Sequence, residues 1–216
     1  MTHKKPIANQ RQPIWGRVVR VVPLTHTIGI RMTAHIAIYA GSFDPITTGH
    51  LDVVKRARGM FDKVILGIGQ NPDKQSLLPC EKRVSLATTL VEELVNEAPD
   101  LAPVEVTPYE GLTVDFAKTS GAVALIRGIR NVTDLAAETQ LAITNRQVAD
   151  IETVFIVTGE MYAFTSSSLI RQIAALGGDS DRLSNLIPPL VIETLETMQS
   201  EEGGPLQSLI QENQME

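Results

Sequence analysis

The chain has 216 residues, of which 43% are hydrophobic and 20% are charged, and this composition is typical of one globular domain. The net charge of −6 argues against a general affinity for nucleic acid, and no apolar run is long enough to cross a bilayer. The single cysteine, Cys80, excludes an internal disulfide and fits a cytoplasmic protein.

The two ends of the chain differ in charge from the part between them. Residues 1–31 contain six Lys or Arg and no acid, whereas residues 200–216 contain four Glu and no base. The basic, acid-free start is similar to an organelle transit peptide, but it lacks the serine enrichment of one. We interpret residues 1–31 as a disordered extension, residues 32–199 as the folded domain and residues 200–216 as an acidic tail.

Strand and helix patterns alternate along the domain. The expected strands are the apolar runs Ile36–Tyr39, Lys63–Ile68, Pro103–Thr107, Ala122–Ile126 and Thr153–Val157. The expected helices are one that opens at His50 and those over Glu81–Asn96, Thr113–Lys118, Asp134–Ala149, Ser168–Leu176 and Leu183–Met198. Such alternation with short connections predicts an α/β fold with a single Rossmann-like, doubly wound, parallel five-stranded sheet.

The loop after the first strand has the features of a phosphate site. The sequence GSFDPITTGH joins a strand to a helix, and the first N–H groups of a helix attract an anion. Gly41 and Gly49 allow close approach of a ligand, and Ser42, Thr48 and His50 add polar side chains. The loop is neither a Walker A motif nor a Rossmann fingerprint.

Polar residues also follow the other strands, at the edge where an open parallel sheet binds ligands. They are Ser42 and His50 after the first strand, Lys74 after the second, Arg127 and Arg130 after the fourth, and Ser166, Ser167 and Ser168 after the fifth. A histidine in a first helical turn can donate a hydrogen bond to a phosphate, and two arginines can hold phosphate oxygens bidentately. We therefore expect a site for a phosphorylated ligand.

A nucleophilic triad is a weaker interpretation of the same loop. Ser42, Asp44 and His50 supply the three side chains, but the GxSxG elbow is missing, and Asp44 before Pro45 is expected to shape the turn.

Three motifs resemble one family of enzymes. TTGH behind GSFDP, LIRGIRN at 125–131 and YAFTSSSLIR at 162–171 are similar to the motifs of the phosphopantetheine adenylyltransferases, within the nucleotidyltransferase superfamily, and the resemblance extends from about Ile36 to about Glu196. It implies transfer of the adenylyl group of ATP to 4′-phosphopantetheine by direct in-line displacement, with dephospho-coenzyme A and pyrophosphate as products.

The resemblance also implies the roles of individual residues. The catalytic residues would be His50, as the transition-state stabiliser, Lys74 and Arg127. The ATP-binding residues would be Ser42, Phe43, His50, Gly128, Ile129, Arg130, Glu138, Tyr162, Ala163, Phe164, Thr165, Ser166, Ser167 and Ser168. The residues that bind phosphopantetheine would be Ser42, Lys74, Thr113 and Arg127. The family more often has Thr at the position of Ser42, Trp at that of Tyr162, and a larger apolar residue at that of Thr113.

No metal-binding motif is present in the sequence, because the four histidines show neither HExxH nor Cys/His spacing. We expect Mg²⁺ to be bound mainly through ATP phosphates and water. The resemblance further implies a homohexamer and feedback by coenzyme A. Alternative functions are a nicotinate-nucleotide adenylyltransferase, a glycerol-phosphate cytidylyltransferase and a non-catalytic ATP-binding module.

Overall fold

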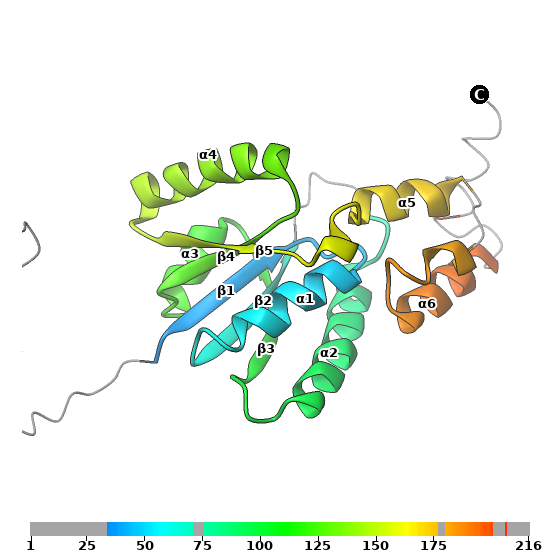
Figure 1. Ribbon diagram of the computed structural model, residues 1–216, viewed down its shortest axis with the longest axis horizontal. Helices are drawn as coiled ribbons and strands as arrows, with labels where there is room; N and C mark the ends of the chain where they lie inside the picture. Colours follow the sequence, from blue (N-terminus) through cyan, green and yellow to red (C-terminus); the bar gives the residue numbers. More distant parts are fainter. Residues whose placement is uncertain (1–33, 71–75, 177–179, 201–205, 207–216) are drawn as a thin grey trace, which may run out of the picture. The chain divides into compact units, whose positions relative to one another are not determined.

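A parallel sheet with strand order β3-β2-β1-β4-β5 is the centre of the structure, a computed structural model that describes residues 34–70, 76–176, 180–200 and 206 (Figure 1). The strands are β1 (Ile36–Gly41), β2 (Lys63–Gln70), β3 (Val104–Glu110), β4 (Ala124–Ile129) and β5 (Glu152–Val157). The helices are α1 (Thr48–Ala57), α2 (Cys80–Glu97), α3 (Thr113–Thr119), α4 (Val132–Ala149), α5 (Ser167–Ala175) and α6 (Pro189–Ser200), with 3-10 turns η1 (Glu160–Tyr162) and η2 (Ser180–Leu183). The predicted doubly wound, five-stranded parallel sheet is confirmed.

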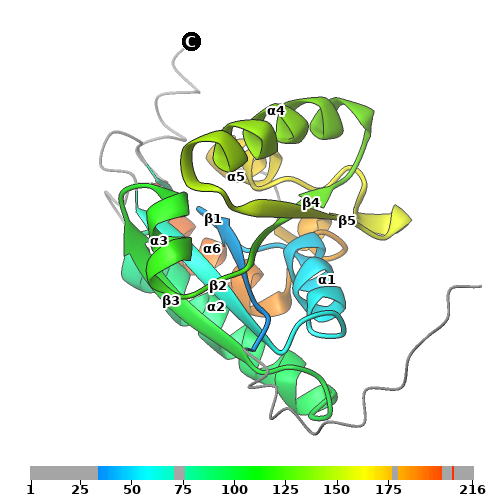
Figure 2. The same cartoon turned by 90° about the vertical axis from the view of Figure 1, so that its left-hand side faces the viewer.

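Helices cover both faces of the sheet, and the alternation of side chains along β1 shows how. Ala37 and Tyr39 belong to the larger core, which includes side chains of α1, α2, α5 and α6. Ile38 and Ala40 belong to the smaller core, with side chains of α3 and the end of α4. Because β1 is buried on both faces, it is a continuous apolar run in the sequence. Figure 2 shows α3 and α4 on the side of the sheet opposite α1 and α2.

Most strands continue further at their carboxyl ends than the apolar runs predict. β1, β2, β3 and β4 end two or three residues later than expected, at Gly41, Gln70, Glu110 and Ile129. Apart from Tyr109 and Ile129, the additional residues are polar, small or proline, but parallel neighbours still pair with their backbones. Arg127 therefore lies within β4 and not after it.

The starts of α1 and α6 differ from the sequence prediction for identifiable reasons. α1 begins at Thr48 rather than His50, because the Thr47 side chain caps it. The helix predicted from Leu183 begins only at Pro189, so that prediction was wrong over its first turns. Consecutive Pro188 and Pro189 explain the late start, since proline disfavours a helical residue before it but suits the first helical position.

No helix in the described ranges is long and apolar enough to cross a membrane.

Candidate active site

A pocket of about 280 Å³ lies at the carboxyl ends of β1 and β4, where the strand order reverses. This is the place where open α/β sheets bind their ligands. Its lining consists of Tyr39, Ala40, Gly41, Ser42, Phe43, Thr47, Gly49, His50, Arg127, Gly128, Arg130, Glu138, Thr158, Thr165, Ser166, Ser167, Ser168 and Arg171. Most of the predicted site residues are therefore brought together by the fold.

His50 is held in one orientation by the start of α1. The Thr47 hydroxyl accepts a hydrogen bond from the His50 backbone N–H at 3.3 Å, and the Thr47 backbone N–H donates to Nδ1 of His50 at 3.1 Å. This reciprocal pair is a capping box with histidine in the place usual for Glu or Gln. Because Nδ1 accepts a backbone proton, the neutral ring carries its own proton on Nε2.

The surroundings of His50 favour this neutral form. Burial, together with the positive charges of Arg130 and Arg127, lowers the pKa of His50 to about 4, and burial is the largest of these causes. The rings of Phe43 and Tyr39 meet the imidazole edge to face, with centroids 5.0 and 6.2 Å away. At neutral pH the ring is thus a fixed, uncharged Nε2–H donor.

Arg127 of β4 is bound to a carboxylate in the pocket wall. Its Nε and Nη2 donate to the two carboxylate oxygens of Glu138 on α4 at 2.6 and 2.7 Å, and Nη1 donates to the Ala40 carbonyl at 3.0 Å. Burial alone would lower the pKa of Arg127, but the hydrogen bonds and charge of Glu138 raise it above its ordinary value. The pair fixes the guanidinium beside the end of β1.

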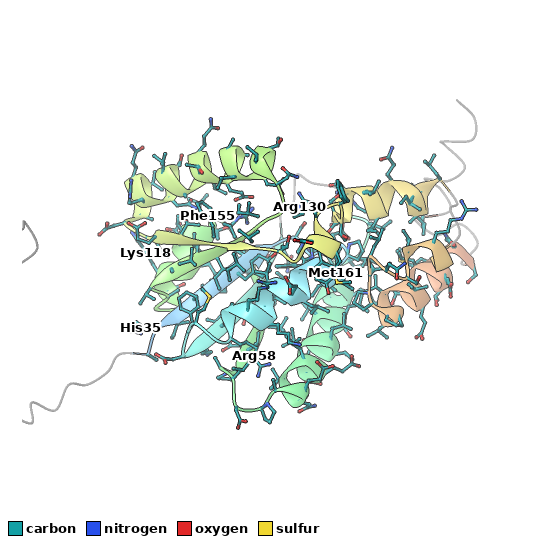
Figure 3. The ribbon with its side chains drawn as sticks, viewed as in Figure 1. His35, Arg58, Lys118, Arg130, Phe155 and Met161 are labelled. Carbon is teal, nitrogen blue, oxygen red and sulfur yellow. The ribbon has the colours of Figure 1, made fainter. Side chains whose placement is uncertain are left out.

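Arg130, which directly follows β4, has a similar arrangement. It forms a bidentate pair with Asp134, at 2.8 and 3.1 Å, and donates to the Thr165 carbonyl at 2.8 Å. It therefore links the start of α4 to the segment before α5, and Figure 3 shows it between these two elements. The Thr165 hydroxyl is buried and has no hydrogen-bond partner among the described residues.

The loop after β1 is anchored by long-range contacts. The Asp44 carboxylate accepts hydrogen bonds from the N–H groups of Leu77 and Leu78, at 2.8 Å each, so it fixes the loop to the segment before α2. The prediction that Asp44 shapes its own turn is therefore wrong, and its carboxylate has no hydrogen bond to His50, which speaks against a Ser–His–Asp triad. Arg83 is buried and donates to the Ser42 carbonyl at 2.6 Å.

The three serines at the start of α5 differ in their partners. Ser166 caps the helix, and Ser167 donates to the Pro45 carbonyl at 2.8 Å. Ser168 accepts from Nη2 of Arg171 at 3.1 Å, while Nη1 of Arg171 donates to the Asp44 carbonyl at 2.6 Å. The helix start, a cation and the β1 loop therefore meet at one side of the pocket.

A second cavity, of about 60 Å³, lies beside Arg127. Its lining is largely apolar, with three polar side chains, and consists of Ala40, Thr113, Leu125, Ile126, Arg127, Leu141 and Asn145. Arg127 and Ala40 line both cavities. Thr113 and Arg127, which the resemblance assigns to the same acceptor, therefore line one cavity.

Some predicted site residues do not line the main pocket. Ile129 is buried within the sheet, and Phe164 is 88% exposed. Tyr162 packs on α1: a Cβ added to Gly49 would lie 3.3 Å from the Cβ of Tyr162, which is why a residue without a side chain suits that position. Ala163 is half-buried beside it. Lys74 lies outside the described residues, as does the predicted extension.

Several residues that line these cavities were not among the predicted site residues. Tyr39 reads as an ordinary core aromatic, and Asn145 as a polar residue within a helix. Thr47 could have been found from its place before TGH, three residues ahead of His50. Arg171 ends the SSSLIR motif, and its position one turn after Ser168 was the available signal.

The pocket also bears on the expected magnesium ion. Glu138 is the acidic side chain among the described lining residues, and it is occupied by Arg127. The described part of the chain contains no group of three His, Cys, Asp or Glu that could hold a metal. The expectation that Mg²⁺ is bound mainly through ATP phosphates and water stays a prediction.

The chain is similar in sequence to known nucleotidyltransferases. Residues 38–173 match the family model described as cytidylyltransferase-like. Phosphopantetheine adenylyltransferase of Rhodopirellula baltica is 44% identical over 172 residues, which are 79% of this chain and 92% of that protein. The protein of the same name from Moorella thermoacetica is 44% identical over 161 residues, 74% of this chain and 94% of that protein.

Solved structures share the fold at low sequence identity. Nicotinic acid mononucleotide adenylyltransferase of Plasmodium falciparum is 18% identical, with a TM-score of 0.56 over 78% of this chain and 97% of that one. A bifunctional NMN adenylyltransferase/ADP ribose pyrophosphatase of Francisella tularensis is 15% identical, with a TM-score of 0.60 over 85% of this chain and 54% of that one. These structures support the nucleotidyltransferase type of sheet.

Proposed function

The chain belongs to the phosphopantetheine adenylyltransferase family of nucleotidyltransferases, and from this premise we propose that it transfers the adenylyl group of ATP to 4′-phosphopantetheine. The products would be dephospho-coenzyme A and pyrophosphate. The observation that carries the proposal is the neutral, fixed Nε2–H donor of His50 in a pocket that also contains Arg127 and Arg130.

The chemical step needs no proton transfer to the protein. A phosphate oxygen of the acceptor attacks the α-phosphorus of ATP, a new P–O bond forms, and the bond to the β-phosphate oxygen breaks with its electron pair on pyrophosphate. Since the acceptor is already an anion, what the site contributes is position and stabilisation of charge. His50 Nε2–H donates to an α-phosphate oxygen, where negative charge develops.

The cations and helix starts would divide the phosphates between them. Arg127 lines both cavities, so it suits the acceptor phosphate at their junction, with Thr113 and Asn145 along the acceptor's arm. Arg130, Arg171 and the N–H groups at the start of α5 suit the ATP phosphates. Mg²⁺ bound to those phosphates would supply additional neutralisation of charge.

Glu138 would act through Arg127 in this scheme. The expected direct contact between Glu138 and ATP remains a prediction, whereas its bidentate pair with Arg127 gives it a positioning role. The geometry therefore adds a task for Glu138 that the resemblance did not imply.

The experiment that tests the function is pyrophosphate release from ATP and Mg²⁺ with three acceptors. We expect release with 4′-phosphopantetheine and none with nicotinate mononucleotide or glycerol-3-phosphate. Release with one of the other two would replace the substrate and keep the class of reaction. Silence with all three would overturn the proposed transfer and favour the non-catalytic module.

The role of His50 has its own test. His50→Gln keeps a side-chain acceptor for the Thr47 N–H and therefore the capping box, whereas His50→Ala removes this acceptor as well as the Nε2–H donor. We expect turnover to fall about 10²- to 10³-fold in both variants, with little change in ATP affinity. Equal losses of turnover and ATP affinity would contradict a role in the transition state.

The proposed homohexamer rests on the resemblance, and α4 offers a surface that suits association. Four apolar side chains of α4 are between 42% and 66% exposed, namely Leu135, Leu141, Ile143 and Val148. The neighbouring edge strand β5 exposes Val157 to 66%. Exposed apolar side chains at such density often mark contacts between subunits. Light scattering after gel filtration should give six chain masses, and Val148→Lys should lower that mass. A monomeric wild-type protein would contradict the assembly.

A further inference from the structure

Tyr39 has a polar group that the packing of the fold does not use. The residue is 6% exposed and its ring packs in the larger core. Its hydroxyl has no hydrogen-bond partner among the described residues. The hydroxyl oxygen nevertheless keeps some exposure to solvent, because it is absent from the fully buried atoms without a partner. A buried polar group without a partner is costly, so the hydroxyl points to a ligand or water in the pocket that Tyr39 lines.

The position of the hydroxyl can be located from its neighbours. A Cβ added to Gly128 would lie 3.4 Å from the Tyr39 oxygen, so this oxygen lies against the backbone that joins Arg127 to Arg130. The Tyr39 ring meets Phe43 edge to face at 5.2 Å and His50 at 6.2 Å. The hydroxyl thus lies between the arginine-bearing strand β4 and the histidine at the start of α1.

The charge state of Tyr39 suits a donor. Burial raises the pKa of the phenol well above its ordinary value, although Arg127 and Arg130 act in the opposite direction. The hydroxyl is therefore protonated at any pH at which the protein is assayed. Like His50 Nε2–H, it is a neutral group that can donate to an anion without first losing a charge.

We propose that the Tyr39 hydroxyl is a further catalytic group of this site, which donates a hydrogen bond to an oxygen of the phosphate held between His50 and Arg127. The inference deepens the proposed function, in which that phosphate is the α-phosphate of ATP. Removal of one donor to a charged oxygen should lower kcat/KM about 10- to 100-fold.

The test is Tyr39→Phe, which deletes one oxygen and keeps the ring against His50 and Phe43. AMP is the binding probe, because its phosphate corresponds to the α-phosphate and its binding needs no acceptor. We expect Tyr39→Phe to bind AMP about 10-fold more weakly, or to turn over at least 10-fold more slowly, with an unchanged or higher Tm. A higher Tm would follow because the fold itself gives the hydroxyl no partner.

Tyr109→Phe is the matched control. The Tyr109 and Thr113 hydroxyls share a hydrogen bond of 2.7 Å, and Tyr109 does not line the main pocket. This variant should lose stability and bind AMP as the wild type does.

Three outcomes would overturn the role of Tyr39: AMP binding and turnover both within twofold of wild type, a clear fall in the Tm of Tyr39→Phe, or its failure to fold. If the wild type transfers to none of the acceptors, the proposed function fails by itself, and AMP binding still decides the role of Tyr39.

Discussion

The arginines at the two ends of the sheet are bound in different ways. Arg58, at the end of α1, is 2% exposed, and its guanidinium donates to the backbone carbonyls of Ala102, Leu94, Ala98 and Leu101 at 2.7 to 3.4 Å. Arg127 and Arg130, at the carboxyl ends of the strands, have side chains 29% and 32% exposed, and each is paired with a carboxylate of α4. Figure 3 shows Arg58 far from Arg130.

The difference separates a structural cation from a binding cation. Backbone carbonyls at a chain reversal accept hydrogen bonds from Arg58, and burial lowers its pKa. The two site arginines instead face a pocket while a carboxylate fixes their planes, so their remaining donors can meet an anion. Arg83 is intermediate: it is buried and bound to carbonyls like Arg58, but one of them belongs to Ser42 in the pocket wall.

Arg58→Met should have the largest effect on stability. It leaves four backbone carbonyls without this donor, and we expect the free energy of unfolding to fall by about 4 kcal/mol. Turnover per folded molecule should not change. Urea unfolding and activity assays on the same preparation measure both. The matched control is Arg146→Met, whose side chain is 57% exposed and should cost less than about 1 kcal/mol. A loss of turnover in folded Arg58→Met would contradict the purely structural role of Arg58.

Arg127→Ala should have the opposite profile. We expect kcat/KM for the acceptor to fall about 100-fold, since two charge-assisted donors to a phosphate are lost, and the loss of stability to be smaller than that of Arg58→Met. Arg127→Lys should be intermediate, because it keeps the charge without the planar fork. Steady-state kinetics with a thermal melt of each variant would show this. Unchanged kcat/KM in Arg127→Ala would mean that this arginine is structural too.

Asp44→Asn should loosen the loop that follows β1, because Asp44 fixes this loop to the segment before α2. An amide can accept one of the two N–H bonds from Leu77 and Leu78 but presents N–H groups to the other. We expect a loss of about 1–2 kcal/mol in the free energy of unfolding, read from urea melts, and a modest fall in turnover as the loop moves. A stable variant with normal turnover would show that this anchor is dispensable.

His50 predicts a pH dependence of stability. Its folded pKa of about 4 lies below the ordinary 6.5, so the unfolded chain binds a proton in this interval and the folded chain does not. The contribution of neutral His50 to the free energy of unfolding is therefore complete above about pH 6.5 and is lost as the pH falls towards 4. Urea melts across this range should therefore lose less stability in His50→Gln than in wild type. Parallel curves for the two proteins would contradict the lowered pKa.

The sequence was sufficient for the architecture because the core strands are apolar runs and the helix between β2 and β3, α2, has clear amphipathic spacing. The sequence also predicted that Ser42, His50, Arg127 and Ser166 lie at one edge of the sheet, because the carboxyl ends of parallel strands meet there. Pro188 and Pro189 were sufficient to place the start of α6. The prediction began the helix at Leu183 instead, because it followed the helical spacing of the apolar residues in this segment.

Pairings between distant residues were not accessible in the same way. The bond from Arg127 to Glu138 depends on how α4 lies over β4, and that of Asp44 to Leu77 and Leu78 on a loop returning beside another. Arg58 and Arg83 read as surface residues in any sequence pattern, because burial of an arginine is decided by carbonyls that only the fold assembles.

The protonation state of His50 is the most direct test of the proposed catalysis, and ¹⁵N NMR of the histidine-labelled protein measures it, with His50→Gln to assign its signals. We expect a neutral ring with the proton on Nε2 and no titration between about pH 5.5 and 8. A ring that becomes cationic near pH 6.5, or that carries its proton on Nδ1, would contradict the neutral donor on which the proposed catalysis depends.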